Sequence, residues 1–182
     1  MLYYIEVCYP KNNLNFVSTH LDSFSIFARG TIKEYLNFGS QLVKDRVKDN
    51  LTVIFHEFNK DFTCKIACYK TDDITIILIS NKDFQMASFR YIINVLLKER
   101  VAQQFLDNFI RAYQNPKTFD KITRVQDEIA QVKEILINDI DKLLERGEKI
   151  EDLIILSQNM SDHAKLFAKR SKKLNEWCCT LL

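Results

Sequence analysis

A regular spacing of apolar residues over the last third of the chain constrains its fold more than any other feature. Between Ile122 and Leu174, intervals of three and four alternate without a break and define a seam of sixteen positions, twelve of them apolar. A continuous helix with this heptad pattern would be about 80 Å long and would need partner helices to cover its apolar stripe. The apolar seam positions are Ile122, Val125, Ile129, Val132, Leu136, Leu143, Ile150, Leu153, Met160, Ala164, Phe167 and Leu174.

Arg146 occupies a seam position near the middle, where leucine or isoleucine is the usual residue. Burying an unpaired guanidinium is costly, so partner helices would have to supply hydrogen-bond acceptors at the same level, which would fix their register. Alternatively, a slight rotation of the helix would let the Arg146 side chain extend to solvent. The residue alone leaves both interpretations open.

The first part of the chain has a different period. Up to about Lys82, alternating β-branched and aromatic residues predict five strands, interrupted once by helical spacing, and two further helical segments follow. This order predicts an α+β fold, a sheet with helices on its faces. The expected strands are 2–9, 15–20, 51–58, 62–69 and 74–80, and the expected helices are 31–48, 84–97 and 101–113.

The segment Gln114-Asn115-Pro116-Lys117 separates these two parts, because a proline disfavours helix in the residue before it. We therefore expect a folded domain at 1–112, a linker at 113–116, the coiled-coil segment at 117–174 and a tail at 175–182. Cys8, Cys64 and Cys68 fall in expected strands, where we expect them to pack as small apolar residues.

The tail Cys178-Cys179-Thr180-Leu181-Leu182 has the form of a C-a-a-X box preceded by a second cysteine. This motif predicts an isoprenoid on Cys179, and the terminal leucine favours geranylgeranyl. One lipid chain holds a protein to a membrane only marginally, so we expect a second signal. Cys178 could carry a palmitoyl group or a second isoprenoid. An accidental Cys-Cys end on a protein without lipid is the alternative.

A basic cluster lies just before this tail and could meet anionic lipid headgroups. It consists of Lys165, Lys169, Arg170, Lys172 and Lys173. No apolar run approaches the roughly 20 residues that span a bilayer, and the first residues do not form a signal peptide. These features predict a protein that faces the cytosol and is held to membranes through lipid.

Composition argues against two other classes of protein. The net charge of +2 gives no electrostatic reason to expect a nucleic-acid partner. A prenylated GTPase would share the tail, but the only glycines are Gly30, Gly39 and Gly147, and none lies in a phosphate-binding loop. The three histidines are scattered and suggest no catalytic group. We expect neither an enzyme nor a cofactor other than covalent lipid.

The residues around Arg146 resemble the motif of the R-SNAREs. Lys142 to Leu153, flanked by Val132, Leu136 and Phe167, matches that motif with every seam position in phase. The resemblance implies that Arg146 meets three glutamines from partner SNARE helices in a parallel four-helix bundle.

The whole chain resembles the longin-domain R-SNAREs that carry two lipids in place of a transmembrane helix. The resemblance rests on Ser23 to Arg29, Glu34 to Phe38, Tyr113 to Pro116 and the Cys-Cys tail. It implies a profilin-like longin domain with a five-stranded antiparallel sheet, and a role in intracellular vesicle fusion at the Golgi, ER-derived vesicles or endosomes. A longin-type adaptor with a self-associating coiled coil is the alternative.

An exposed apolar seam is a liability in the cytosol, so a closed state in which the longin domain covers the seam and the lipids is expected. We expect Phe38, with Phe27 and Tyr35, to form the apolar groove for this contact, although such aromatic residues could equally be core. Three features depart from the family, and one of them is the short connection between the expected helices 84–97 and 101–113. Leu182 favours geranylgeranyl where the family favours farnesyl, and Asp139 occupies a seam position that is usually asparagine or apolar.

Overall fold

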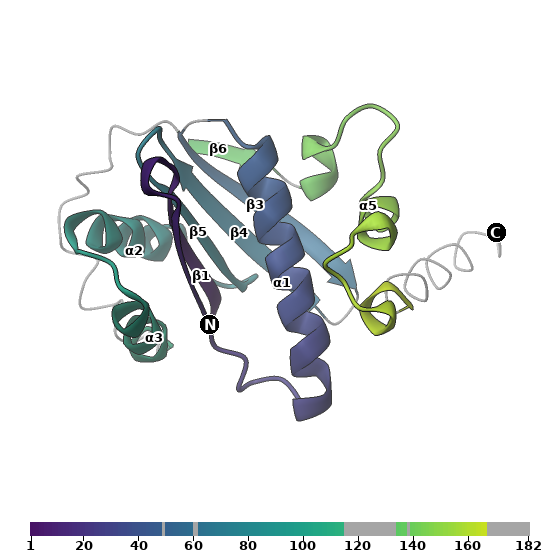
Figure 1. The fold of residues 1–182 in the computed structure, drawn as a ribbon, viewed down its shortest axis with the longest axis horizontal. Helices are drawn as coiled ribbons and strands as arrows, with labels where there is room; N and C mark the ends of the chain where they lie inside the picture. The colour runs from purple at the N-terminus through teal and green to yellow at the C-terminus, as the bar shows by residue number, and fades with distance from the viewer. Residues whose placement is uncertain (49, 60–61, 115–133, 138, 167–182) are drawn as a thin grey trace.

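The fold is a central sheet with helices on both faces (Figure 1). The computed structural model describes residues 1–48, 50–59, 62–114, 134–137 and 139–166. Strands β1 (Leu2–Tyr9) and β2 (Leu14–Thr19) are joined through a short 3-10 helix, η1 (Pro10–Asn12). Helix α1 (Ile26–Arg46) then leads to β3 (Asn50–Asn59), β4 (Phe62–Lys70) and β5 (Thr75–Asn81), and α2 (Met86–Lys98) and α3 (Gln103–Ala112) follow.

The strands form one sheet in the order β2-β1-β5-β4-β3-β6. The five expected strands are all present and pair antiparallel, as predicted. The sixth strand, β6 (Glu134–Ile137), comes from the seam segment and pairs parallel to β3. The sequence did not predict this strand.

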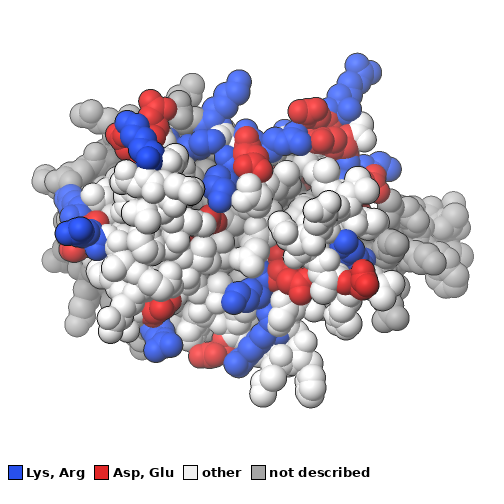
Figure 2. Space-filling model, in the orientation of Figure 1, with Lys and Arg blue, Asp and Glu red and all other residues white. Residues whose placement is uncertain are grey.

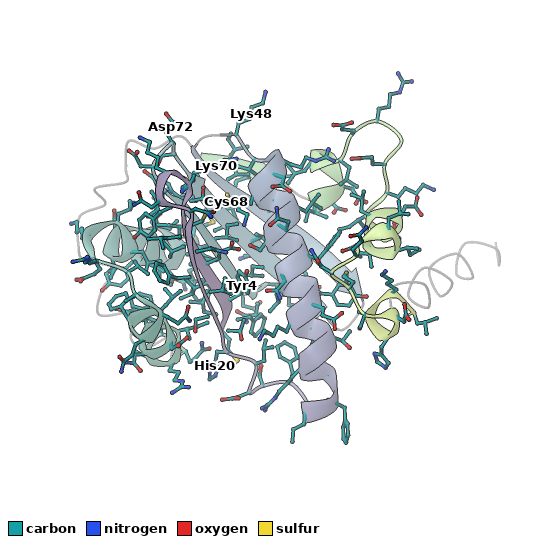
Figure 3. The ribbon with its side chains drawn as sticks, in the orientation of Figure 1. Tyr4, His20, Lys48, Cys68, Lys70 and Asp72 are labelled. Carbon is teal, nitrogen blue, oxygen red and sulfur yellow. The ribbon has the colours of Figure 1, made fainter. Side chains whose placement is uncertain are left out.

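Alternation of side chains along the strands creates an apolar core on each face of the sheet. On one face, residues such as Ile5 and Leu78 pack against α2 and α3 through Phe89, Ile92 and Leu106. On the other face, Tyr4 and Ile77 pack against α1 through Leu36 and Val43. Tyr4, labelled in Figure 3, thus lies on the side of the sheet that α1 covers. The predicted α+β class is confirmed.

A lysine from the sheet closes the C-terminal end of α1. The last carbonyl groups of a helix have no partner within the helix. Lys70 at the end of β4 donates hydrogen bonds from Nζ to the carbonyl oxygens of Lys44 (2.8 Å) and Val47 (3.0 Å). These bonds fix the last turn of α1, which ends at Arg46, against the end of β4.

A buried carboxylate joins β1 to the C-terminal half of α1. Glu6 is only 3% exposed and accepts hydrogen bonds from Tyr4 Oη (2.9 Å) and Ser40 Oγ. Lys44 Nζ lies 2.8 Å from Glu6 Oε1. Burial alone would raise the pKa of Glu6, but the hydrogen bonds from Lys44, Ser40 and Tyr4 outweigh burial and hold this pKa below its ordinary value. Glu6 is therefore ionised and paired at neutral pH.

The described part of the seam is not one continuous helix. Residues 134–166 instead form β6, the 3-10 helix η2 (Ile140–Leu143), helix α5 (Ile150–Leu156) and a helical stretch at 162–166. The expectation of a single long helix is thus wrong for this state of the chain. An isolated amphipathic helix gains little without partners, whereas this segment gains strand pairing and buries apolar side chains on the domain.

Within the described ranges, no helix has both the length and the hydropathy needed to cross a bilayer.

Candidate functional site: the seam segment on the folded domain

Residues 134–166 of the seam segment run over the edge of the sheet and along α1 (Figure 1). β6 extends the sheet at β3, with Leu51 opposite Glu134 and Ile54 opposite Ile137. After η2 and a turn, α5 and the helical stretch at 162–166 follow beside α1. The segment is thus docked on the domain from which it extends.

Apolar side chains form the core of this contact. The segment contributes five buried residues, and they share one core with Tyr35, Leu36 and Val43 of α1. Burying a side chain of the size of isoleucine or methionine contributes about 1.5 to 3 kcal/mol relative to exposure, so the larger of these residues dominate the stability of the docked state. They are Ile140, Ile150, Ile154, Met160 and Ala164.

Polar contacts set the position of the C-terminal part of the docked segment. The buried hydroxyl of Tyr35 donates to the carbonyl oxygen of Ala164 at 2.9 Å. The carboxylate of Glu34 accepts a hydrogen bond from the backbone N–H of Ser161 at 2.7 Å. Three residues further towards the start of α1, Thr31 Oγ1 lies 3.3 Å from His163 Nδ1. One face of α1 therefore contacts residues 161–164, through the backbone of Ser161 and Ala164 and the side chain of His163.

An arginine at the end of α1 holds the turn between η2 and α5. Arg46 Nη2 lies 3.0 Å from Glu148 Oε2, and Arg46 Nη1 lies 3.5 Å from Glu145 Oε1. The backbone N–H of Glu145 donates to the same Glu148 carboxylate at 2.8 Å. This backbone bond and the bond from Arg46 lower the pKa of Glu148, so the carboxylate is ionised at neutral pH.

Charges of both signs are interspersed over the face that carries α1 and the docked segment (Figure 2). This face therefore presents no field of a single sign that would attract a polyanion. The segment is held by the individual contacts described above, not by a general potential.

The seam residues divide between buried and exposed positions in the docked segment. Ile150, Met160 and Ala164 are buried, and Leu143 and Leu153 are partly buried against the same core. Leu136, in β6, is 61% exposed, and Arg146 is exposed on the turn. Asp139 caps η2, where its carboxylate accepts from the N–H of Asp141. Ile150, Met160 and Ala164, which a helical bundle would bury, are therefore already buried against the domain.

Sequence reasoning missed two docking residues. Ile140 and Ile154 lie beside the seam, not in it, and both are almost completely buried. Each follows a seam position directly, which puts it on the flank of the helical stripe. A signal was present, because these two large apolar residues stand on a flank whose other residues are mostly small or polar.

The expected groove residues have different environments. Tyr35 is buried and bonded to the segment, and Phe38 is half-buried. Phe38 lines a hollow of about 330 Å³ together with Met160 of the segment, Glu6 and Lys44. Phe27 does not line it: its side chain is 95% exposed in the first turn of α1, so this assignment is wrong. Phe27 precedes the helix that the sequence predicted at 31–48, and the apolar stripe of α1 begins only with Ile32.

Several predicted residues lie outside the described residues. They are the seam residues Ile122, Val125, Ile129, Val132, Phe167 and Leu174, the cysteines Cys178 and Cys179, and the basic residues Lys169, Arg170, Lys172 and Lys173. Of the basic cluster, Lys165 is described and is half-buried.

Comparison with known proteins places the chain in a family. Residues 121–180 match the synaptobrevin family. The synaptobrevin homolog ykt6 of Schizosaccharomyces pombe is 30% identical over 183 residues, covering 88% of each chain. The synaptobrevin homolog YKT6 of Saccharomyces cerevisiae is 25% identical and covers 89% of this chain and 88% of its own. The chain belongs to the synaptobrevin family and is an R-SNARE, a protein of vesicle fusion.

Proposed function

We propose that this R-SNARE assembles with three glutamine SNARE helices into a parallel four-helix bundle, and that the docked state described above holds the seam back until partners bind. The observation that carries the proposal is the burial of Ile150, Met160 and Ala164 against the domain. The same side chains cannot face α1 and a bundle core at once. Docking and assembly therefore compete for one set of residues.

Arg146 would have its role only in the bundle. In the docked segment its side chain is exposed, which agrees with a residue that the closed state does not use. In the middle of a four-helix core, the guanidinium would need acceptors from the partner helices, and glutamine amide oxygens could supply them. Arg146 would then set the register of the bundle.

The tail would join this assembly to a membrane. We propose an isoprenoid on Cys179 and a palmitoyl or second isoprenoid group on Cys178, since two lipids hold a protein far more firmly than one. The chain would then cycle between the cytosol and the cytosolic face of Golgi, ER-derived vesicle or endosomal membranes. Zippering of the bundle would pull on the lipids as it closes.

The bundle is tested by mixing the full chain with three soluble glutamine SNARE helices and measuring a stable complex by size and thermal melting. Arg146→Leu should still form helical complexes, but should lose most of its preference for glutamine-bearing partners over partners with leucine at the central level. Lys149→Leu, an exposed position three residues away, is the control. Equal preference in the wild type and Arg146→Leu would contradict the role of Arg146, and self-association without partners would favour an adaptor.

The anchor is tested by expressing the full chain in cells and separating membranes from cytosol. Cys179→Ser removes the predicted prenylation site and should move nearly all of the protein to the cytosol, because the second lipid alone binds marginally. Cys178→Ser should leave a partial membrane fraction. Membrane recovery of Cys179→Ser equal to wild type would contradict the anchor.

A further inference from the structure

One turn of the docked segment has a backbone conformation that a helix does not allow. In residues 145–148, the N–H of Glu148 donates to the carbonyl oxygen of Glu145 at 3.0 Å, which closes a four-residue turn. Gly147 is the third residue of this turn and has a φ of +93°. A positive φ at this place is the signature of a type II turn, which favours glycine strongly over residues with a side chain.

The turn is also held by side chains. Glu148 accepts a hydrogen bond from the N–H of Glu145 at 2.8 Å, so the two residues bond each other through both backbone and side chain. The same carboxylate pairs with Arg46 Nη2 at 3.0 Å. Arg46 is the last residue of α1. The turn is therefore fastened to the folded domain, and α5 starts at Ile150, just after it.

The same glycine is a poor residue for the assembled state. In a helix that runs through Arg146 and Ile150, Gly147 would lie in the interior of the helix, directly after the central arginine. Glycine is the least favourable helix residue after proline, because it loses the most backbone freedom. One residue thus favours the docked turn and disfavours the bundle helix.

We propose that Gly147 is a conformational selector that sets the balance between the docked segment and the continuous helix. This inference rests on the proposed function in one respect, namely that the segment becomes helical in its complex. Two changes would let helix run from η2 into α5. The turn would separate from Arg46, and φ at Gly147 would rotate out of the positive region. Gly147 would keep the centre of the seam, with Arg146, from forming helix until contacts with partner helices stabilise the helical state.

Substitution by alanine isolates this backbone effect. A Cβ atom at Gly147 would meet nothing within 4 Å, so Gly147→Ala introduces no clash. It should destabilise the docked turn and favour the helix, and the two effects together should shift the balance about 30-fold towards the continuous helix. Gly147→Asn should lie between glycine and alanine, because asparagine tolerates positive φ but is a weak helix former.

The experiment is amide hydrogen exchange on the full chain alone, read at the backbone amides of α5. Exchange should rise about 10-fold in Gly147→Ala, because in the chain alone only the loss of the docked turn acts, and it should rise less in Gly147→Asn. Gly30→Ala is the matched control, because Gly30 lies within α1 and its added Cβ also meets nothing within 4 Å. Gly30→Ala should leave the exchange of α5 unchanged.

Two results would overturn the inference: exchange in Gly147→Ala that equals the wild type, or a greater effect of asparagine than of alanine. Because no partner helix is present, failure of bundle formation would not change this readout, and it would count against the proposed function alone. Melting of the complex provides a second readout. If Gly147 had only a structural role, its substitution would lower the stability of both the docked segment and the bundle. Gly147→Ala should instead raise the melting temperature of the bundle.

Discussion

Ile154→Asp is expected to release the seam segment from the domain while leaving every seam residue in place. Ile154 is 3% exposed and shares a core with Tyr35, Leu36 and Val43. Either the carboxylate would be buried without a partner, at a cost of about 3 kcal/mol, or the segment would dissociate from the domain. Dissociation costs less free energy, because the domain retains its own core. Amide exchange in α5 should rise about a hundredfold, and assembly with glutamine SNARE helices should be correspondingly faster.

Leu156→Asp is the matched control for this prediction. Leu156 lies in the same helix and also lies beside the seam, but it is 76% exposed in the docked state. The same change of residue should therefore leave exchange in α5 and the rate of assembly close to wild type. Faster assembly by Leu156→Asp to the same degree would mean that added charge, not undocking, causes the effect. Unchanged exchange in Ile154→Asp would contradict the competition between docking and assembly.

Lys44→Met is expected to destabilise the folded domain by about 3 kcal/mol. The substitution leaves the Glu6 carboxylate buried without its cation, and breaking a buried ion pair in this way is among the most costly single changes. The methionine keeps most of the aliphatic stem, so lost packing contributes little. Urea unfolding of the full chain measures the effect. Lys33→Met, at an exposed position of the same helix, should change the midpoint little.

The pH dependence gives a second check on Lys44. The folded-state pKa of Glu6 lies below its ordinary value of 4.5, so its contribution to stability is present above that pH and is lost as the pH falls through the folded pKa. The difference between wild type and Lys44→Met should therefore shrink on acidification below about pH 4.5. Adding Glu6→Gln to Lys44→Met should recover part of the loss at neutral pH, since the amide oxygen can still accept from Ser40 and Tyr4. A constant difference across this pH range would contradict the assigned cause.

The folded domain could be predicted closely from the sequence, because its signals are local. Alternation of apolar residues defined all five strands to within a residue or two, and helical spacing located the three helices. The start of α1 was the main error, since the helix begins at Ile26 and not near Thr31. That first turn carries exposed apolar residues, Ile26 and Phe27, which have no periodic relation to the buried stripe.

The seam was also visible in the sequence, but its conformation was not. Heptad spacing records what the segment buries in a complex with other helices, and the match to the synaptobrevin family over 121–180 agrees with it. The spacing contains no information on what the segment does without partners. The strand β6 and the burial of Ile140 and Ile154 depend on a free edge at β3 and an apolar face on α1, which are far away in the chain.

By itself, the sequence determined the α+β domain, the position of the seam and Arg146 at its centre, and it contains the Cys178-Cys179 motif from which lipidation is predicted. Only the tertiary structure decided that the described part of the seam lies on its own domain as strand, turn and short helix. The physical reason is that one amphipathic segment has two ways to bury its apolar side chains, and the choice depends on which surfaces are present. Gly147, with its positive φ beside Arg146, is the point in the chain where these two solutions diverge.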